Sequence, residues 1–309
     1  MKLCGIDIQP GEKKRMVLPA EGIPPLEVIL FCGAHPGKTL VVTAGVHGCE
    51  YVGVEALRRL SEVLQPDLMH GNVILLPLVN PEGFYAGAKR IVPSDGINLN
   101  RAFPGDPEGS ASARIAAAIE RLVYPHADLL VDLHGGDCNE QLCPLVFCPV
   151  AGETWVNERA AEAARVLDVP YRVRSTAKNG LYSWAVQCGI PALLVERGGQ
   201  GQWSEEEVSA CMRDVRALLT HLHILSGNGP VQKQTEIAQA IYEEAPFDGF
   251  WYPRTAAGAH VLQGELLGRL QATDGSVYEV RASFAGVTLY YTTALGVHAG
   301  DALVAYGSA

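Results

Sequence analysis

Residues 39–56 constrain the fold more than any other stretch of the chain. They begin with a short apolar run, Leu40-Val41-Val42, which is typical of a strand buried on both faces. After residue 50 the apolar residues recur at helical spacing instead, at Val54, Leu57, Leu60 and Leu64. The pattern therefore predicts a strand, a tight turn and an amphipathic helix over 50–64.

The turn between this strand and helix carries His47 and Glu50, three residues apart. At a strand-to-helix junction this spacing can aim both side chains at one point, and an imidazole with a carboxylate is a common ligand pair for Zn²⁺. Taken alone, the pair is also typical of an ordinary helix N-terminus with an acidic first turn. The metal interpretation therefore depends on what the rest of the chain brings to the same place.

Two later strands are predicted to end in groups of the same chemical type. The alternation of buried strands and amphipathic helices predicts an α/β fold, with strands over 71–78, 127–133 and 192–195 and helices over 111–123, 153–167 and 205–225. The second of these strands runs into Asp132-Leu-His134, and the third runs into Glu196. Because ligands of open parallel sheets bind at the carboxyl ends of the strands, we expect these groups to meet His47 and Glu50 there.

Together these side chains have the composition of a catalytic metal site. Two imidazoles and one carboxylate, from His47, Glu50 and His134, leave a fourth tetrahedral position for water. Glu196 could take a proton from that water and pass it to a leaving amine. Asp132 precedes His134 by two residues and points the same way on a strand, where it could orient a metal-bound histidine; a plain strand-end turn is the alternative.

The connection over 84–110 is long and weakly patterned, which in a compact domain is usually a sign of function. Its Arg90 could stabilise an oxyanion. Asn100 and Arg101 could hold a substrate carboxylate, since a guanidinium matches carboxylate geometry. The alternative for these three residues is a loop held together by salt bridges.

Five segments, in this order, give the chain a resemblance to a known family: His47-Gly-Cys-Glu50, Asn80-Pro-Glu-Gly83, Asp95-Gly-Ile-Asn-Leu-Asn-Arg-Ala-Phe-Pro-Gly105, Asp132-Leu-His134-Gly and Val195-Glu196-Arg-Gly-Gly. The set resembles the succinylglutamate desuccinylase/aspartoacylase family, a branch of the zinc carboxypeptidase superfamily. The similarity covers most of residues 38–202, and the Asn-Leu-Asn-Arg-x-Phe-Pro-Gly block is its most specific part. The Gly-Gly-Gln-Gly that follows Arg197 resembles the branch that deacetylates N-acetyl-diaminobutyrate more than it resembles aspartoacylase itself.

The resemblance implies a carboxypeptidase-like domain with a mixed central sheet flanked by helices, over residues 1–228. It implies one Zn²⁺ per chain on His47, Glu50 and His134, with Glu196 as general base. It also places Arg90, Asn100 and Arg101 among the binders of the substrate carbonyl and carboxylate. The activity that it implies is hydrolysis of the amide bond of a small N-acyl amino acid or related N-acyl amine.

The last part of the chain, residues 229–309, differs in character from the first. A linker is expected at Ser226-Gly-Asn-Gly-Pro230, followed by short glycine-punctuated strands that predict a small all-β domain. This segment resembles the family's barrel-sandwich hybrid domain, which is similar to biotinyl and lipoyl carriers. Carriers present a lysine at a hairpin tip, and no lysine follows Lys233, so we expect the domain to shape substrate access or to build an oligomer interface.

Charge and cysteine content limit the partners and the compartment. A formal net charge of −10 without a basic stripe argues against nucleic-acid binding, and no apolar run is long enough to span a bilayer. The first residues lack the apolar core of a signal peptide, and the eight scattered cysteines contain no Cys-x-x-Cys, so we expect reduced thiols and a cytoplasmic protein. Homo-oligomer formation stays open.

Two other functions fit the same residues. A metallocarboxypeptidase acting on short peptides would use the same metal and base, but a β-domain that narrows the entrance disfavours long peptides. A zinc-dependent module that binds a metabolite without catalysis would have no need for the carboxylate of Glu196. The sequence does not name the acyl group or the amino acid of the substrate, because these depend on pocket residues that a single sequence does not map.

Overall fold

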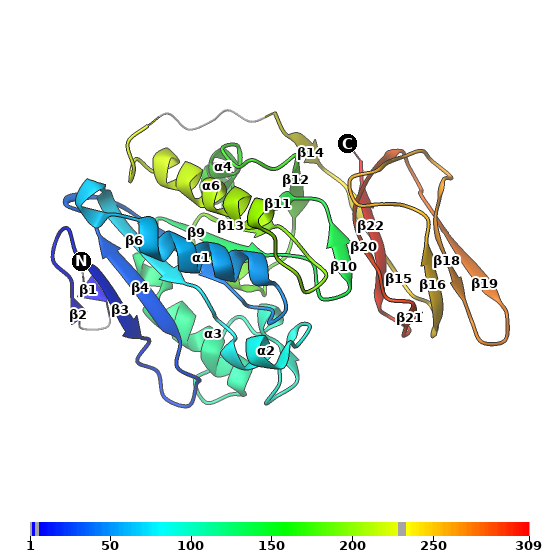
Figure 1. Ribbon diagram of the computed structural model, residues 1–309, viewed down its shortest axis with the longest axis horizontal. Coiled ribbons are helices and arrows are strands. Elements are labelled where there is room, and N and C mark those ends of the chain that lie inside the picture. Colours follow the sequence, from blue (N-terminus) through cyan, green and yellow to red (C-terminus); the bar gives the residue numbers. More distant parts are fainter. Residues whose placement is uncertain (1, 4–5, 228–232, 309) are drawn as a thin grey trace.

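The structure is a computed structural model that describes residues 2–3, 6–227 and 233–308 (Figure 1). Its main feature is a nine-stranded sheet, with the strands in the spatial order β14 (Thr235–Ile237), β12 (Tyr171–Ser175), β11 (Leu145–Pro149), β13 (Ala192–Glu196), β9 (Leu129–His134), β5 (His35–Ala44), β6 (His70–Leu76), β4 (Glu27–Cys32) and β3 (Lys13–Val17). The predicted linker and the predicted boundary between 228 and 229 fall partly on residues 228–232, which lie outside the described residues.

The sheet is mixed, as the family resemblance implied. Its central strands β6, β5, β9 and β13 are parallel to one another, whereas β4 pairs antiparallel with β6 and β11 pairs antiparallel with β13. The predicted parallel crossover from β5 to β6 is present, and Leu40, Val41 and Val42 are fully buried in β5. The apolar run at 40–42 is therefore the centre of the sheet.

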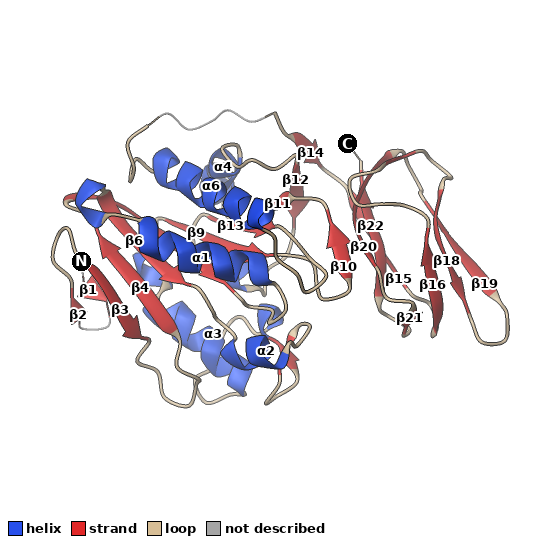
Figure 2. Ribbon diagram, viewed as in Figure 1, coloured by secondary structure: helices blue, strands red, loops and turns tan. Residues whose placement is uncertain are grey.

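Helices cover both faces of the sheet (Figure 2). The described α-helices are α1 (Tyr51–Val63), α2 (Pro81–Ala86), α3 (Ala111–Leu122), α4 (Thr154–Ala164), α5 (Leu181–Gln187) and α6 (Glu205–His221). Helices α1, α4 and α6 pack into the core on one face, through residues such as Leu57, Ala160 and Val215. Helices α3 and α5 pack on the other face, through residues such as Ile115 and Leu181. None of the described helices is both long and apolar enough to cross a bilayer.

The connection over 84–110 is more ordered than the sequence pattern suggested. Asn80-Pro-Glu-Gly83 begins helix α2 rather than closing a simple turn, because the side chain of Asn80 accepts a hydrogen bond from the amide of Gly83 and Pro81 occupies the first helical turn. The chain then forms a hairpin of β7 (Ile91–Val92) and β8 (Ile97–Asn98) and a short 3₁₀ turn, Leu99–Arg101. Asn-Pro-x-Gly is typical of a turn by residue type, but here Asn80 caps a helix.

The end of the chain is an all-β sandwich, as predicted (Figure 2). One sheet has the order β10 (Glu140–Leu142), β20 (Gly286–Thr292), β22 (Ala302–Gly307) and β15 (Ala240–Glu244), with β17 (His260–Val261) beside β20; the other has the order β19 (Val277–Arg281), β18 (Leu266–Gln271), β16 (Gly249–Pro253) and β21 (Gly296–Val297). Trp251 and Tyr306 are buried in a core of this sandwich. A two-stranded ribbon of β1 (Lys2–Leu3) and β2 (Ile6–Asp7) completes the described strands.

The sandwich and the large sheet are joined through strands. Strand β10 leaves the loop after β9 and pairs antiparallel with β20, so a segment of the first part of the chain lies at the edge of the sandwich. In the other direction, β14 follows the linker region but extends the large sheet beside β12. The division into residues 1–228 and 229–309 stays a prediction, and these exchanges hold the sandwich beside the end of β9.

Candidate active site

Three adjacent strands of the large sheet bring the predicted site together. In the register of the sheet Ala44 of β5 lies beside Leu133 of β9, and His134 of β9 lies beside Glu196 of β13. The loop after β5 adds His47 and Glu50. Gly48 between them permits a close approach to α2, because a Cβ there would lie 2.1 Å from the carbonyl carbon of Gly83.

His47, Glu50 and His134 form a compact, buried cluster. Their potential ligand atoms lie within 4.8 Å of one another. One oxygen of Glu50 lies 2.7 Å from Nδ1 of His47 and the other lies 2.9 Å from Nδ1 of His134, so both imidazoles present the same ring nitrogen to one carboxylate. This donor set fits a divalent zinc ion, which prefers imidazole and carboxylate ligands and leaves a catalytic site one open position.

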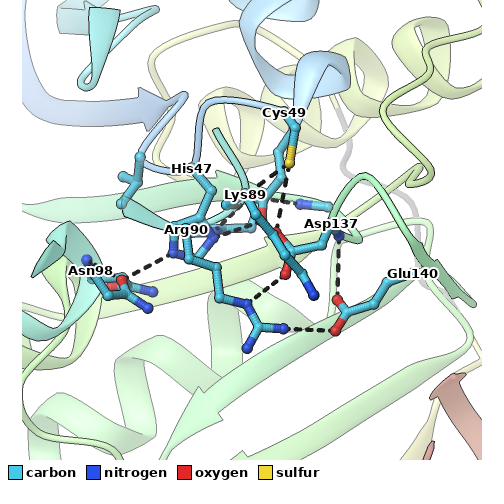
Figure 3. Close-up of polar contacts among 12 residues, drawn as sticks. His47, Cys49, Lys89, Arg90, Asn98, Asp137 and Glu140 are labelled. Carbon is cyan, nitrogen blue, oxygen red and sulfur yellow. Dashed lines mark hydrogen bonds and ion pairs between the residues drawn. The ribbon is translucent and has the colours of Figure 1, made fainter. Parts of the chain in front are cut away.

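The opposite nitrogens of both rings are held from outside the cluster. Nε2 of His134 donates to Asp132 at 2.8 Å, and Asp132 in turn accepts from the hydroxyl of Thr43 at 2.6 Å. Nε2 of His47 lies 3.2 Å from Oδ1 of Asn98 (Figure 3). Such contacts set the tautomer and direction of the ring, leaving Nδ1 free to bind a metal. Asp132 thus contacts the imidazole of His134, and its orienting role stays a prediction. Asn98 was missed although it stands in the Asn-Leu-Asn-Arg block.

Charge interactions dominate the cluster. Burial alone would raise the pKa of Glu50, but the two imidazoles outweigh it and lower that pKa to about 2. Burial likewise opposes protonation of His134, but Asp132 and Glu50 outweigh it and raise the pKa of that imidazole well above its usual value. The carboxylates thus attract positive charge to this point in the protein interior, and a metal cation would supply it.

We expect Asp132→Asn to weaken metal affinity by roughly 10- to 100-fold, because it removes the charged partner that orients His134. Affinity is measured by competition with a chromophoric chelator. The matched control is Asp128→Asn, whose side chain accepts from the backbone amide of Thr39 and contacts neither histidine in the described structure. Unchanged affinity in Asp132→Asn would contradict the orienting role.

Glu196 lies beside the cluster in an unusual electrostatic environment. Its Oε2 is buried and has no hydrogen-bond partner among the described residues. Burial, and then the charge of Glu50, raise the pKa of Glu196 well above its usual value. A cation bound by the neighbouring cluster would stabilise the carboxylate form and offset this rise. The unpartnered oxygen is therefore free to accept a proton from a water or a ligand.

Arg197, the residue after Glu196, stabilises the end of strand β13. Arg197 is buried, and its Nε donates to Asp214 of α6 at 2.6 Å while its guanidinium also reaches the carbonyl of Asp168. This pair ties the end of β13 to the helix layer. The glycines that follow then turn the chain back toward Asp137 and Glu140, whose carbonyls both accept from the amide of Gln200.

Arg90 is held by two carboxylates (Figure 3). Its Nε donates to Asp137 at 2.5 Å and its Nη2 donates to Glu140 at 2.7 Å. Sequence reasoning placed Arg90 near the site but missed both acids, which follow His134 by three and six residues. Their position directly after a metal-ligand motif was the available signal.

Asn100 and Arg101 line the same cavity as the cluster. The side-chain oxygen of Asn100 accepts from the amide of Leu181, so Asn100 also anchors the start of α5. Gly180 makes this possible, since a Cβ there would lie 2.3 Å from that oxygen. Arg101 donates to the carbonyl of Asn100, and no carboxylate of the described residues lies within salt-bridge distance of it.

All the predicted site residues except Asp132 line one cavity of about 390 Å³. The sandwich contributes two tyrosines to its wall, Tyr242 of β15 and Tyr290 of β20, whose ring centroids are 6.0 Å apart. The sequence favoured a core position over a pocket position for Tyr290, because aromatic residues are more often buried in the core. Tyr242 was missed, because a single tyrosine in a short strand carries no functional signal. The cavity therefore draws its wall from both parts of the chain.

Comparison with known proteins identifies the family of the chain. Residues 36–222 match the family model described as the succinylglutamate desuccinylase/aspartoacylase catalytic domain. The chain belongs to the succinylglutamate desuccinylase/aspartoacylase family. The resemblance read from the sequence motifs is thereby confirmed.

Relatives within the family include deacylases. The chain is 31% identical over 278 residues to an N-alpha-acetyl-L-2,4-diaminobutyric acid deacetylase of Halomonas elongata, covering 86% of this chain and 81% of the relative. A crystal structure of a succinylglutamate desuccinylase/aspartoacylase from Rhodobacter sphaeroides matches with a TM-score of 0.89 at 26% identity, over 99% of this chain and 98% of that one. The product-bound ectoine utilization protein EutE (DoeB) of Ruegeria pomeroyi matches with a TM-score of 0.85 at 27% identity, over 93% and 90%.

Proposed function

We propose that this protein is a zinc-dependent deacylase that hydrolyses the amide bond of a small N-acyl amino acid. The observation that carries the proposal is the convergence of His47, Glu50 and His134 with the unpartnered carboxylate of Glu196 at one cavity. The deacetylase relative from Halomonas elongata supports the reaction class. A module that merely binds a metabolite would have no use for a buried, unpartnered carboxylate oxygen beside the predicted metal ligands.

His47, Glu50 and His134 hold the metal in this proposal, one Zn²⁺ per chain. When bound, zinc polarises the acyl carbonyl and makes a water more acidic. Asp132 and Asn98 fix the two imidazole rings through their Nε2 atoms, so the ligand nitrogens are oriented before the metal arrives.

Glu196 moves the proton. Its Oε2 accepts a proton from the water as the water oxygen bonds to the acyl carbon. Glu196 then gives that proton to the amide nitrogen as the carbon–nitrogen bond breaks, which releases the amine of the amino acid. No other carboxylate oxygen among the described residues is both buried and without a partner.

Three further residues bind the substrate. Arg90 stabilises negative charge on the acyl oxygen, and its ion pairs with Asp137 and Glu140 fix its direction in advance. Arg101, together with Asn100, holds the α-carboxylate, since its guanidinium has no carboxylate of its own among the described residues. The sandwich limits the size of the substrate through Tyr242 and Tyr290.

The proposal is tested by amine release from a panel of N-acyl amino acids, with and without added zinc. We expect zinc-dependent release from a few short acyl compounds and poor cleavage of peptides of several residues, because the cavity is small and partly walled by the sandwich. Efficient trimming of long peptides would favour the metallocarboxypeptidase instead. Tight binding of N-acyl amino acids without any hydrolysis would favour the non-catalytic module.

A further inference from the structure

The distribution of charge in the cavity separates its two arginines. Arg90 faces two carboxylates at ion-pair distance, so the group of Arg90, Asp137 and Glu140 carries a net charge of −1 when both acids are ionised. Arg101 has no such partner among the described residues and keeps its charge for a ligand. The cavity therefore offers one uncompensated guanidinium for a substrate carboxylate and an acidic group elsewhere on its wall.

The acidic group is rigid. Asp137 and Glu140 are 1% and 9% exposed, and the backbone amide of each is bonded within the turn that joins them, Asp137 to the Glu140 carboxylate and Glu140 to the Asp137 carbonyl. Glu140 is the first residue of β10, which pairs with β20 of the sandwich opposite Thr292. The backbone of both acids is therefore fixed, and the Glu140 carboxylate is also held by the amide of Asp137.

The tyrosines of the sandwich extend the same wall. Tyr290 lies beside Glu140 and Arg90 closely enough that their charges affect the pKa of its hydroxyl, although burial is the main cause of its rise. Tyr242 is its ring neighbour. Electron-rich rings next to carboxylates attract an ammonium group.

We propose that Asp137 and Glu140 act as a specificity filter that rejects substrates with a second carboxylate and favours a side chain that is neutral or carries an ammonium group. The filter rests on the proposed deacylase function. With the α-carboxylate on Arg101 and the acyl carbonyl at the metal cluster, the substrate side chain shares the remaining cavity with the acidic wall. A second carboxylate there meets the like charge of Asp137 and Glu140, because the N–H groups of Arg90 that these acids leave free are taken by the acyl oxygen.

The test compares three substrates of similar size and different charge. N-acetylasparagine and N-acetylaspartate have the same shape, and N-acetyl-2,4-diaminobutyrate adds the ammonium group. We expect the zinc-loaded protein to favour the asparagine compound over the aspartate compound by roughly 100-fold in kcat/KM, as expected for like charges held close together in a partly buried site. The diaminobutyrate compound should be at least as good as the neutral one. A ratio near one between the neutral and the acidic compound would overturn the filter.

Two variants assign the preference to the acidic pair. Glu140→Gln and Asp137→Asn are each expected to reduce the asparagine-to-aspartate ratio about tenfold. The ratio cancels any loss of activity common to both substrates, such as a looser hold on Arg90. Glu243→Gln on β15, which removes one negative charge outside the cavity lining, is the control and should keep the wild-type ratio. Unchanged ratios in both acidic-pair variants would overturn the assignment, and if one variant does not fold, the other decides.

Binding separates failure of the filter from failure of the proposed function. Hydrolysis of all three compounds, with an asparagine-to-aspartate ratio near one, would contradict the specificity filter but still support the deacylase function. Absence of any hydrolysis would contradict the deacylase function. Calorimetric binding of free asparagine and free aspartate to the zinc-loaded protein would then test the specificity filter. At least tenfold weaker binding of aspartate, reduced in Glu140→Gln, supports it; equal binding, or no binding of either, overturns it.

Discussion

Replacing Glu196 by glutamine is expected to lower kcat by roughly 10²- to 10⁴-fold while metal content stays unchanged. Glutamine keeps the shape of the side chain but cannot accept the proton that the buried Oε2 is free to take. Glu196 is also no member of the His47, Glu50 and His134 cluster, so the metal ligands remain complete. The measurement is zinc-dependent amine release in parallel with metal analysis of the purified variant.

The matched control for this variant is Glu243→Gln, a half-buried carboxylate of β15 outside the cavity lining. It should keep wild-type turnover. If Glu196→Gln also retains turnover, the assigned base is wrong, and another group lining the cavity must move the proton. Loss of both metal and turnover would mean instead that Glu196 acts through the integrity of the metal site.

Removing the metal, or one of its ligands, is expected to abolish activity. Dialysis against a chelator should reduce amine release to background, and added Zn²⁺ should restore it. The His134→Ala variant should release amine at the background rate with or without added Zn²⁺. His134 is buried between Glu50 and Asp132, so its loss removes one ligand and leaves Asp132 without its imidazole. Zinc that binds the folded but not the unfolded protein also stabilises the fold, by about 2.7 kcal/mol at a zinc concentration 100 times Kd.

This stabilisation gives a readout that does not depend on activity. The Tm of the wild-type protein should rise on addition of zinc, and that of His134→Ala should not. His126→Ala is the control, because that histidine lies in a short turn before β9 and outside the cluster. A zinc-dependent Tm shift that survives in His134→Ala would place the metal elsewhere in the molecule.

The predicted parts of the site depend on local sequence. His47 and Glu50 stand in one turn, and His134 and Glu196 each end an apolar run. The spacing of apolar residues and the positions of the turns were therefore enough to place all four at one sheet edge. The helix and strand boundaries expected from the sequence lie close to the observed ones. Asn80 and Pro81, which by residue type alone are typical of a turn, cap a helix instead. The mixed order of the sheet came from the family resemblance, because apolar runs alone do not distinguish parallel from antiparallel pairing of buried strands.

The sequence by itself determined which residues are proposed to carry the chemistry, because strand ends and short turns impose their geometry over a few residues. Tertiary structure decided what surrounds them. Arg90 meets Asp137 and Glu140 across 47 and 50 positions, and Tyr242 and Tyr290 reach the cavity from the sandwich because β10 pairs with β20. Such contacts depend on the packing of whole layers, which no local pattern encodes. The charge balance of the cavity, and with it the proposed choice of substrate, follows from that packing.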